Sequence, residues 1–143
     1  MAASDPKVAA SNPKIVTCLM FTGQAEEAMK FYTSLFEDSE IISITRYGMN
    51  EDGIEGTVMH ATFSLKGQLF MCIDSPIKHD FTFTPAISLY VECETEDEID
   101  RLFAKLSQDG KVLMPLEAYP FSAKFAWLED KYGVSWQLSL ARK

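Results

Sequence analysis

The chain has 143 residues, a length that suits one domain large enough to bury about two-thirds of the surface its unfolded form would expose. Hydrophobic residues make up 47% and charged residues 24%, close to the globular average, which excludes an intrinsically disordered protein. The formal net charge of -8 and the scattered placement of the 13 Lys and Arg residues argue against a nucleic-acid partner, because a phosphate backbone would be repelled.

The first segment, residues 1–13, predicts a flexible tail rather than a signal peptide, because it lacks a basic start followed by a long apolar core. No later stretch approaches the ~20 consecutive apolar residues that a membrane-spanning helix needs. The 3 cysteines are odd in number and form no C-x-x-C pair, which fits a reducing compartment. We therefore predict a cytoplasmic protein with no membrane partner, folded as one domain over residues 14–141.

The first part of this domain, residues 14–75, predicts a strand, a helix and then three more strands. Its apolar runs, and the helical spacing of Ala28 and Tyr32, indicate the elements in that order. The expected strands are residues 14–21, 40–48, 56–65 and 68–74, and the expected helix is residues 25–36. Lys66 and Gly67 join the last two strands, a two-residue connection that predicts a hairpin.

A connecting segment, residues 76–84, precedes a second part with the same predicted order, residues 85–141. Its helix starts at a capping box formed by Thr95 and Glu98, and Gly110 is expected to end it. The expected strands are residues 86–93, 111–116, 122–129 and 134–140. A connection of this length beside a cavity can act as a lid, and a solvent-exposed linker or a dimer contact explains it equally well.

The repeated order of elements predicts an internal duplication. Each half alone would leave one face of its sheet uncovered, so we expect the halves to join into one domain. The expected fold is α+β, with two tandem βαβββ modules that form a curved mixed sheet around a cavity and carry their helices on the outer face. The concave face of that sheet is then the expected place for a site.

Four stretches of the sequence carry a resemblance to a known family. They are "GQAEEAMKFYTSLF", "HATFSLKGQLFMCID", "EDEIDRLFAKLSQDGKVLMPL" and "DKYGVSWQL", in the expected order. Together with the duplicated module, they resemble the vicinal oxygen chelate superfamily of glyoxalases, extradiol dioxygenases and bleomycin-resistance proteins. Within it they look like the PhnB-like branch, often labelled demethylubiquinone methyltransferase-like. The resemblance covers residues 14–140 and implies a homodimer with cavities near the subunit boundary.

The resemblance also implies where a metal ion would be held. Members with metal chemistry place ligands on the inner face of the first and last strand of each module. The matching positions here are Val16, Met71, Ala86 and Gln137. A divalent ion needs imidazole, carboxylate or thiolate donors, and a lone amide oxygen cannot hold one, so we expect no metal and no other cofactor. An alternative ligand set, which no motif spacing supports, comprises His60, Asp74, His79 and Glu92.

Strand alternation predicts which side chains of the first module face the cavity. A two-residue turn at Lys66 and Gly67 pairs Thr62 with Met71 and places His60 on the same face. Both have a structural explanation as well. His60 can be a hydrogen-bonded structural imidazole, and Met71 can fill a gap in the packing.

A similar count around the turn at residues 130–133 places Lys124 and Ala126 beside Gln137 and Ser139, with Trp127 and Trp136 in the core. Lys124 has a structural alternative, a surface ion pair with Glu129 or Glu117 that contributes ~0 to 1 kcal/mol. The predicted ligand-binding residues, which mix apolar area with hydrogen-bonding tips, are Tyr47, His60, Thr62, Met71, Tyr90, Lys124 and Gln137.

Three functions fit these residues. The first is a metal-free homodimer that binds a small molecule. The second is an enzyme, either with His60 or Tyr90 as acid or base or with glyoxalase-type or dioxygenase-type metal chemistry. The sequence argues against methyl transfer, because it has no glycine-rich turn after a strand to bind a nucleotide-like cofactor. The third is a structural or interaction dimer whose cavity is filled by its own side chains.

Overall fold

The structure, a computed structural model, describes residues 13–49 and 51–142. Residues 1–12 of the predicted tail lie outside the described residues. The chain divides into two compact units, with the boundary between His79 and Asp80 inside the predicted connecting segment. These parts, unit one and unit two, hold the two predicted modules.

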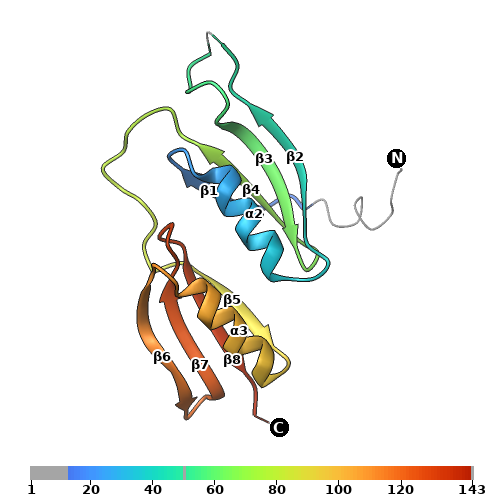
Figure 1. Cartoon of the computed structure of the whole chain (residues 1–143), viewed down its shortest axis with the longest axis vertical. Coiled ribbons are helices and arrows are strands. Elements are labelled where there is room, and N and C mark those ends of the chain that lie inside the picture. Colours follow the sequence, from blue (N-terminus) through green and yellow to red (C-terminus); the bar gives the residue numbers. More distant parts are fainter. Residues whose placement is uncertain (1–12, 50, 143) are drawn as a thin grey trace. The chain divides into compact units, whose positions relative to one another are not determined.

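Unit one is a four-stranded mixed sheet with one helix (Figure 1). Its elements in chain order are β1 (Thr17–Phe21), α2 (Ala25–Leu35), β2 (Glu40–Arg46), β3 (Val58–Leu65) and β4 (Gln68–Asp74). The strands lie in the order β1-β4-β3-β2. β1 runs parallel to β4, and the other neighbours are antiparallel.

Unit two repeats this arrangement with its own sheet and helix (Figure 1). Its elements are β5 (Ser88–Cys93), α3 (Glu96–Leu106), β6 (Lys111–Tyr119), β7 (Ser122–Glu129) and β8 (Ser135–Leu140). The strand order β5-β8-β7-β6, with β5 parallel to β8, matches that of unit one. The predicted α+β class and the two tandem βαβββ modules are therefore confirmed.

Alternation along the strands of unit one separates a buried face from a half-buried face. On the buried face, Phe63 of β3 stacks on Phe70 of β4 with ring centroids 5.3 Å apart. Tyr32 of α2 approaches Phe63 with centroids 6.5 Å apart, and all three rings are buried. Each such side chain contributes about 1.5 to 3 kcal/mol by leaving water. The opposite face, which α2 does not cover, is called the helix-free face of unit one.

The helix of unit two covers one sheet face in the same way. Ile99, Leu102 and Leu106, which recur at helical spacing along α3, are fully buried. α3 contacts β7 and β8, whose buried side chains include Leu128 and Trp136. The other side of this sheet is called the helix-free face of unit two.

The predicted start of α3 is confirmed. The Thr95 hydroxyl accepts a hydrogen bond from the Glu98 N–H at 3.1 Å, and the Glu98 carboxylate accepts one from the Glu94 N–H at 2.8 Å. The first contact satisfies an amide that a helix start leaves without a partner inside the helix, and the second ties the residue before the N-cap to the first turn. The sequence signal was sufficient here because a capping box is a local interaction.

The predicted role of Gly110 is wrong. α3 ends at Leu106, and the residue in the left-handed region after it is Asp109, with a φ of 59°. Gly110 is required for a different reason, since a Cβ at this position would lie 2.1 Å from the Glu129 carbonyl oxygen. The glycine therefore allows the close approach of two backbones.

The predicted hairpin of unit one is confirmed. Lys66 and Gly67 have φ values of 54° and 84°, and positive φ at both central residues is the mark of the turn that suits a two-residue hairpin loop. This turn pairs Thr62 with Met71, as predicted.

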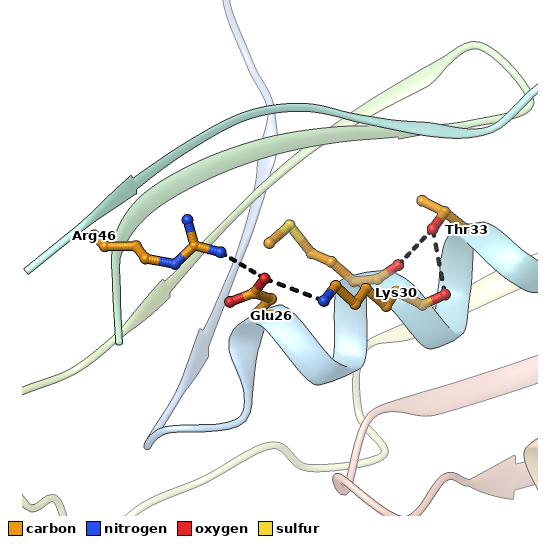
Figure 2. Close-up of polar contacts among 5 residues, drawn as sticks. Glu26, Lys30, Thr33 and Arg46 are labelled. Carbon is orange, nitrogen blue, oxygen red and sulfur yellow. Dashed lines mark hydrogen bonds and ion pairs between the residues drawn. The ribbon is translucent and has the colours of Figure 1, made fainter. Parts of the chain in front are cut away.

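A charged cluster ties α2 to the end of β2, as Figure 2 shows. The Arg46 guanidinium lies 2.5 Å from a Glu26 carboxylate oxygen, and the Lys30 ammonium lies 3.3 Å from the same oxygen. The hydrogen bond from Arg46 lowers the pKa of Glu26. Because partly exposed pairs contribute only ~0 to 1 kcal/mol, this cluster orients the helix start more than it stabilises the unit.

Asp74, at the end of β4, joins three parts of unit one and is 3% exposed. One carboxylate oxygen accepts hydrogen bonds from the Gly23 N–H at 2.8 Å and the Ala25 N–H at 3.0 Å, at the start of α2. The other oxygen accepts one from the Val58 N–H at 2.9 Å, at the start of β3. The negative charge also complements the helix dipole, so a single carboxylate holds the helix against two strands.

Replacing Asp74 should destabilise the protein. We expect Asp74→Asn to lower the free energy of unfolding by about 2 to 3 kcal/mol, because the amide keeps one acceptor and turns a donor toward the Val58 N–H. Urea unfolding followed by circular dichroism measures the change. The control is Asp52→Asn in an exposed loop, expected within about 0.5 kcal/mol of the parent protein. A loss for Asp74→Asn no larger than that of the control would contradict the role given to this carboxylate.

Candidate functional site

The helix-free face of unit one carries a row of side chains that crosses the sheet. The register pairs Ser43 with Thr62, Thr62 with Met71, and Met71 with Cys18. Directly paired residues point to the same side of a sheet. The predicted neighbours Thr62 and Met71 are half-buried there. Cys18 was missed in the sequence, because only the parallel pairing of β1 with β4 brings it into the row.

His60 and Tyr47 differ in their hydrogen bonding. His60 lies on the helix-free face, two residues before Thr62, and is paired with Thr45 of β2. Tyr47 follows β2, and its hydroxyl donates a hydrogen bond to the Asp74 carbonyl oxygen at 3.2 Å. The Tyr47 hydroxyl therefore has a structural partner inside unit one.

The helix-free face of unit two carries the matching row. Tyr90 of β5 pairs with Gln137 of β8, Gln137 with Trp127 of β7, and Trp127 with Met114 of β6. Like Met71 in unit one, Gln137 is paired with the first strand of its module and with the neighbouring antiparallel strand. The register is compatible with the predicted equivalence of these two residues.

The predicted neighbour of Gln137 in β7 is wrong by one residue. Trp127 pairs with Gln137, whereas Lys124 pairs with Leu140. A shift of one residue moves every side chain of a strand to the opposite face. Lys124 consequently lies on the side of α3, and Trp127, expected in the core, lies half-buried on the helix-free face. Trp136 is in the core as predicted.

Lys124 is engaged by α3. Its ammonium lies 2.7 Å from an Asp100 carboxylate oxygen and 3.1 Å from a Glu96 carboxylate oxygen. The hydrogen bond to Asp100, with that to Glu96, raises the pKa of Lys124. The structural alternative of an ion pair is therefore correct, with partners other than Glu117 and Glu129. This contact removes Lys124 from the row of Gln137.

The turn between β7 and β8 is built around Asp130, which is 3% exposed. One carboxylate oxygen accepts hydrogen bonds from the Tyr132 N–H at 2.8 Å and the Val134 N–H at 3.1 Å. The other oxygen accepts one from the Trp136 indole N–H at 2.9 Å. The Asp130 N–H also donates to the Val134 carbonyl oxygen at 2.9 Å. The side chain and backbone of Asp130 thus both hold Val134 in the turn.

This turn explains the error in register. The sequence suggested that the turn ends at Gly133 and that the strand begins at Val134. Because Asp130 binds Val134, five residues separate the last pair of the hairpin, Glu129 and Ser135. One additional turn residue reverses the face of every side chain in β7 relative to β8.

The Trp127 indole is fixed by a short chain of hydrogen bonds. Its N–H donates to the Ser135 hydroxyl at 2.9 Å, and the Ser135 hydroxyl lies 2.7 Å from the Ser88 hydroxyl. Ser135 is buried, and these bonds satisfy it within unit two. Sequence reasoning missed Trp127 as a site residue, because its place follows from the turn at Asp130.

Several polar side chains on the helix-free faces are available for a ligand. Within the part of the chain that the structure describes, the side chains of His60, Thr62, Tyr90 and Gln137 make no hydrogen bond to other residues. His60, Thr62 and Gln137 are half-buried, and Tyr90 is 56% exposed. A polar tip left without a partner next to apolar surface is typical of a ligand pocket.

The register changes one of the positions suggested for metal ligands. Val16 precedes β1 and Ala86 precedes β5. Cys18 pairs with Met71 and Tyr90 pairs with Gln137, so the predicted match of Met71 with Gln137 makes Cys18 equivalent to Tyr90. The residue equivalent to Val16 is therefore Ser88, whose hydroxyl is hydrogen-bonded to the Ser135 hydroxyl and is one neutral oxygen without the carboxylate or imidazole partners that a divalent ion needs.

The alternative metal ligands His60, Asp74, His79 and Glu92, all within the described part of the chain, do not form a cation site. Among the described residues, no three His, Cys, Asp or Glu side chains are close enough to hold a metal ion. Asp74 is occupied by three backbone amides. The His79 ring nitrogen lies 2.9 Å from the Ser75 hydroxyl. A metal-free protein stays a prediction.

The starts of both helices are already capped. Asp74 accepts the Ala25 amide of α2 and the Gly23 amide just before it, and Thr95 accepts the Glu98 amide of α3. A helix start is the usual place to bind the phosphate or carboxylate of a cofactor. In both units that place is taken by a side chain of the protein.

Ser75, the residue before the connecting segment, is held by contacts within unit one. The Ser75 N–H donates to the Phe21 carbonyl oxygen at 2.8 Å, and the Ser75 hydroxyl lies close to His79. Farther along, Phe83 approaches Gly133 of unit two. The suggested lid function stays a prediction. None of the described helices is both long enough and apolar enough to cross a membrane.

Comparisons with known proteins agree with this fold. The family model described as 3-demethylubiquinone-9 3-methyltransferase matches residues 13–139. A PhnB protein from Bacillus cereus is 70% identical, with a TM-score of 0.89, over 90% of this chain and 100% of that one. A Pseudomonas aeruginosa protein is 24% identical, with a TM-score of 0.80, over 92% and 100% of the chains. No curated protein matches.

A glyoxylase/bleomycin resistance protein/dioxygenase domain from Frankia is 16% identical, with a TM-score of 0.60, over 93% of this chain and 95% of that one. At this identity, as with the Pseudomonas aeruginosa protein, the similarity shows a shared fold. The duplicated module is thus common to proteins of different sequence.

The thiols should differ in reactivity. Cys18 is an exposed residue, and the partial burial of its thiol raises its pKa. Cys72 and Cys93 are buried, and this burial raises the pKa of each thiol to about 12. At pH 8 we expect Cys18 to react with Ellman's reagent at least about 100-fold faster than the other two, because only thiolates react and buried thiols are inaccessible. Cys18→Ser should remove the fast phase, and guanidinium should expose every thiol. A fast phase that persists in Cys18→Ser would contradict this assignment.

Proposed function

We propose that this chain, which belongs to the 3-demethylubiquinone-9 3-methyltransferase family, is a homodimeric protein that binds a small organic molecule without a metal ion. The site would lie on the helix-free faces described above. The single observation that carries the proposal is the half-buried amide of Gln137, which has no hydrogen-bond partner among the described residues. An amide in this state is stabilised when a ligand supplies the missing bonds.

The chemistry of the surrounding side chains supports a neutral ligand. Gln137 is flanked by Tyr90 and Trp127, and Met71 holds the equivalent position in unit one. These groups offer apolar area, hydrogen-bond donors and hydrogen-bond acceptors. None of them carries the charge or the imidazole donors that a divalent ion prefers.

Sheet edges support self-association. β1 and β5 are short edge strands of their sheets, each paired on one side only within its unit. An edge strand presents unpaired N–H and C=O groups that another strand or chain can bind. Most soluble oligomers are symmetric homodimers, so a second copy is the partner we propose.

The family description suggests methyl transfer as a second function. Against it stands the state of the helix starts. In unit one the strand-to-helix turn at Gly23 donates its amides to Asp74, and in unit two Thr95 caps α3. The usual cradle for a nucleotide-like cofactor, a glycine-rich turn with free amides, is therefore filled by the protein's own side chains.

Substituting Gln137 should weaken ligand binding. A panel of small aromatic and heteroaromatic compounds is screened by heat-stability shift, and calorimetry then measures the affinity of those that stabilise the protein. We expect Gln137→Leu to raise the Kd of such a compound about 10-fold, the value of one or two lost hydrogen bonds. Gln108→Leu, the same change at an exposed position after α3, should leave the Kd within about twofold.

Equal affinities in Gln137→Leu and Gln108→Leu would sink the proposed site. The same assay includes S-adenosylmethionine, with a quinol precursor as methyl acceptor. Turnover, or a heat-stability shift with S-adenosylmethionine, would instead favour the methyl-transfer function.

Self-association is measured separately. Sedimentation velocity at micromolar protein concentration should give twice the mass of one chain. The dimer should persist in Gln137→Leu, because this side chain points from a sheet face and makes no edge contact. A single species with the mass of one chain over the full concentration range would contradict the homodimer.

A further inference from the structure

The two tryptophans of unit two lie in different surroundings. Trp136 is buried, and its indole N–H donates to the Asp130 carboxylate at 2.9 Å. Trp127 lies half-buried on the helix-free face, and its indole N–H donates to the Ser135 hydroxyl at 2.9 Å. The first belongs to the core, and the second is held at the surface where Gln137 stands.

The hydrogen bond of Trp127 determines how its ring lies. Ser135 is not the direct partner of Trp127 in the hairpin, because Trp127 pairs with Gln137 and Ser135 pairs with Glu129. Diagonal neighbours on a sheet are about 7 to 8 Å apart, so the indole must lean along the sheet to reach the serine. The indole of this half-buried residue is thus tethered on the helix-free face.

The same hydrogen bond also determines which groups of Trp127 remain available to a ligand. An indole has a single donor and no acceptor, and Ser135 takes that donor. The bond between the Ser135 and Ser88 hydroxyls, 2.7 Å long, holds the acceptor in turn. What is left for a ligand is the π-face of the ring, which favours another flat, apolar ring.

Beside this ring stands the amide of Gln137, the next side chain in the row. A primary amide has an acceptor oxygen and two N–H donors, and no described residue bonds to them here. A ligand with an adjacent N–H and C=O can satisfy both kinds of group at once. Tyr90 borders the amide on its other side.

We propose that the ligand of unit two is a planar aromatic molecule with a lactam-like edge, stacked on Trp127 and hydrogen-bonded to Gln137. This inference rests on the proposed function and specifies the ligand class at that site. Unit one offers no such place, because the equivalent positions hold Thr62 and Met71. The duplicated modules therefore differ in ligand chemistry, and the aromatic specificity belongs to unit two.

Proton–nitrogen correlation NMR of the indole N–H groups tests this directly, since the two tryptophans give separate signals that Trp127→Phe assigns. Three probes are titrated into the full chain: carbostyril, which has the aromatic rings and the lactam edge, naphthalene, which has only the rings, and valerolactam, which has only the edge. We expect carbostyril to move the Trp127 signal and to leave the Trp136 signal in place. Valerolactam should bind at least about 10-fold more weakly than carbostyril.

Variants separate the two contacts. We expect Trp127→Leu and Gln137→Leu each to raise the Kd of carbostyril about 10-fold, and Trp127→Phe, which keeps a ring, to raise it no more than about threefold. Naphthalene should respond to Trp127→Leu and be indifferent to Gln137→Leu. Circular dichroism confirms the fold of each variant, and the comparison of carbostyril with valerolactam on the parent protein keeps the test valid if Trp127→Leu does not fold.

Two results would overturn the inference. One is valerolactam binding within twofold of carbostyril, which would show that the aromatic ring adds nothing. The other is a Trp127 signal that no concentration of carbostyril moves. If either occurs while other compounds of the screening panel distinguish Gln137→Leu from Gln108→Leu, the ligand class is wrong and the proposed function stands.

Discussion

The bond between the Asp130 carboxylate and the Val134 amide is the contact on which the candidate site depends. It adds Val134 to the turn between β7 and β8 and thereby sets the register of that hairpin. Because side chains alternate with a period of two, one turn residue decides whether Trp127 or Lys124 shares a face with Gln137. The same carboxylate holds Trp136, so the register and the core of unit two are fixed together.

In unit one, a buried carboxylate likewise holds backbone segments in place. Asp74 accepts three backbone amides and so holds the start of α2 against β3 and β4. A buried charge is tolerated only when hydrogen bonds replace its hydration, and both aspartates meet that condition. Since they are satisfied in this way, neither is available to a ligand. The row residues Thr62, Met71, Tyr90, Trp127 and Gln137 carry hydroxyl, thioether, aromatic and amide groups, which suit a neutral organic molecule.

Duplication preserved the arrangement of the two rows and changed their chemistry. Each row has one residue from each of the four strands of its sheet. At three of the four positions, the equivalent pairs are Cys18 and Tyr90, Met71 and Gln137, and Thr62 and Trp127. Unit one has the smaller and softer side chains, and unit two has the aromatic rings. A shared backbone topology therefore accommodates two different surfaces.

The sequence by itself determined the elements, the duplication and the first hairpin, because these depend on local signals. Apolar spacing, the capping box at Thr95 and the two-residue turn at Lys66 act over a few residues. Only the tertiary structure decided the second hairpin, since a longer turn has no single length until Asp130 binds Val134. It likewise decided the partners of Lys124, because the acidic residues of α3 are close to β7 only after the helix packs on the sheet.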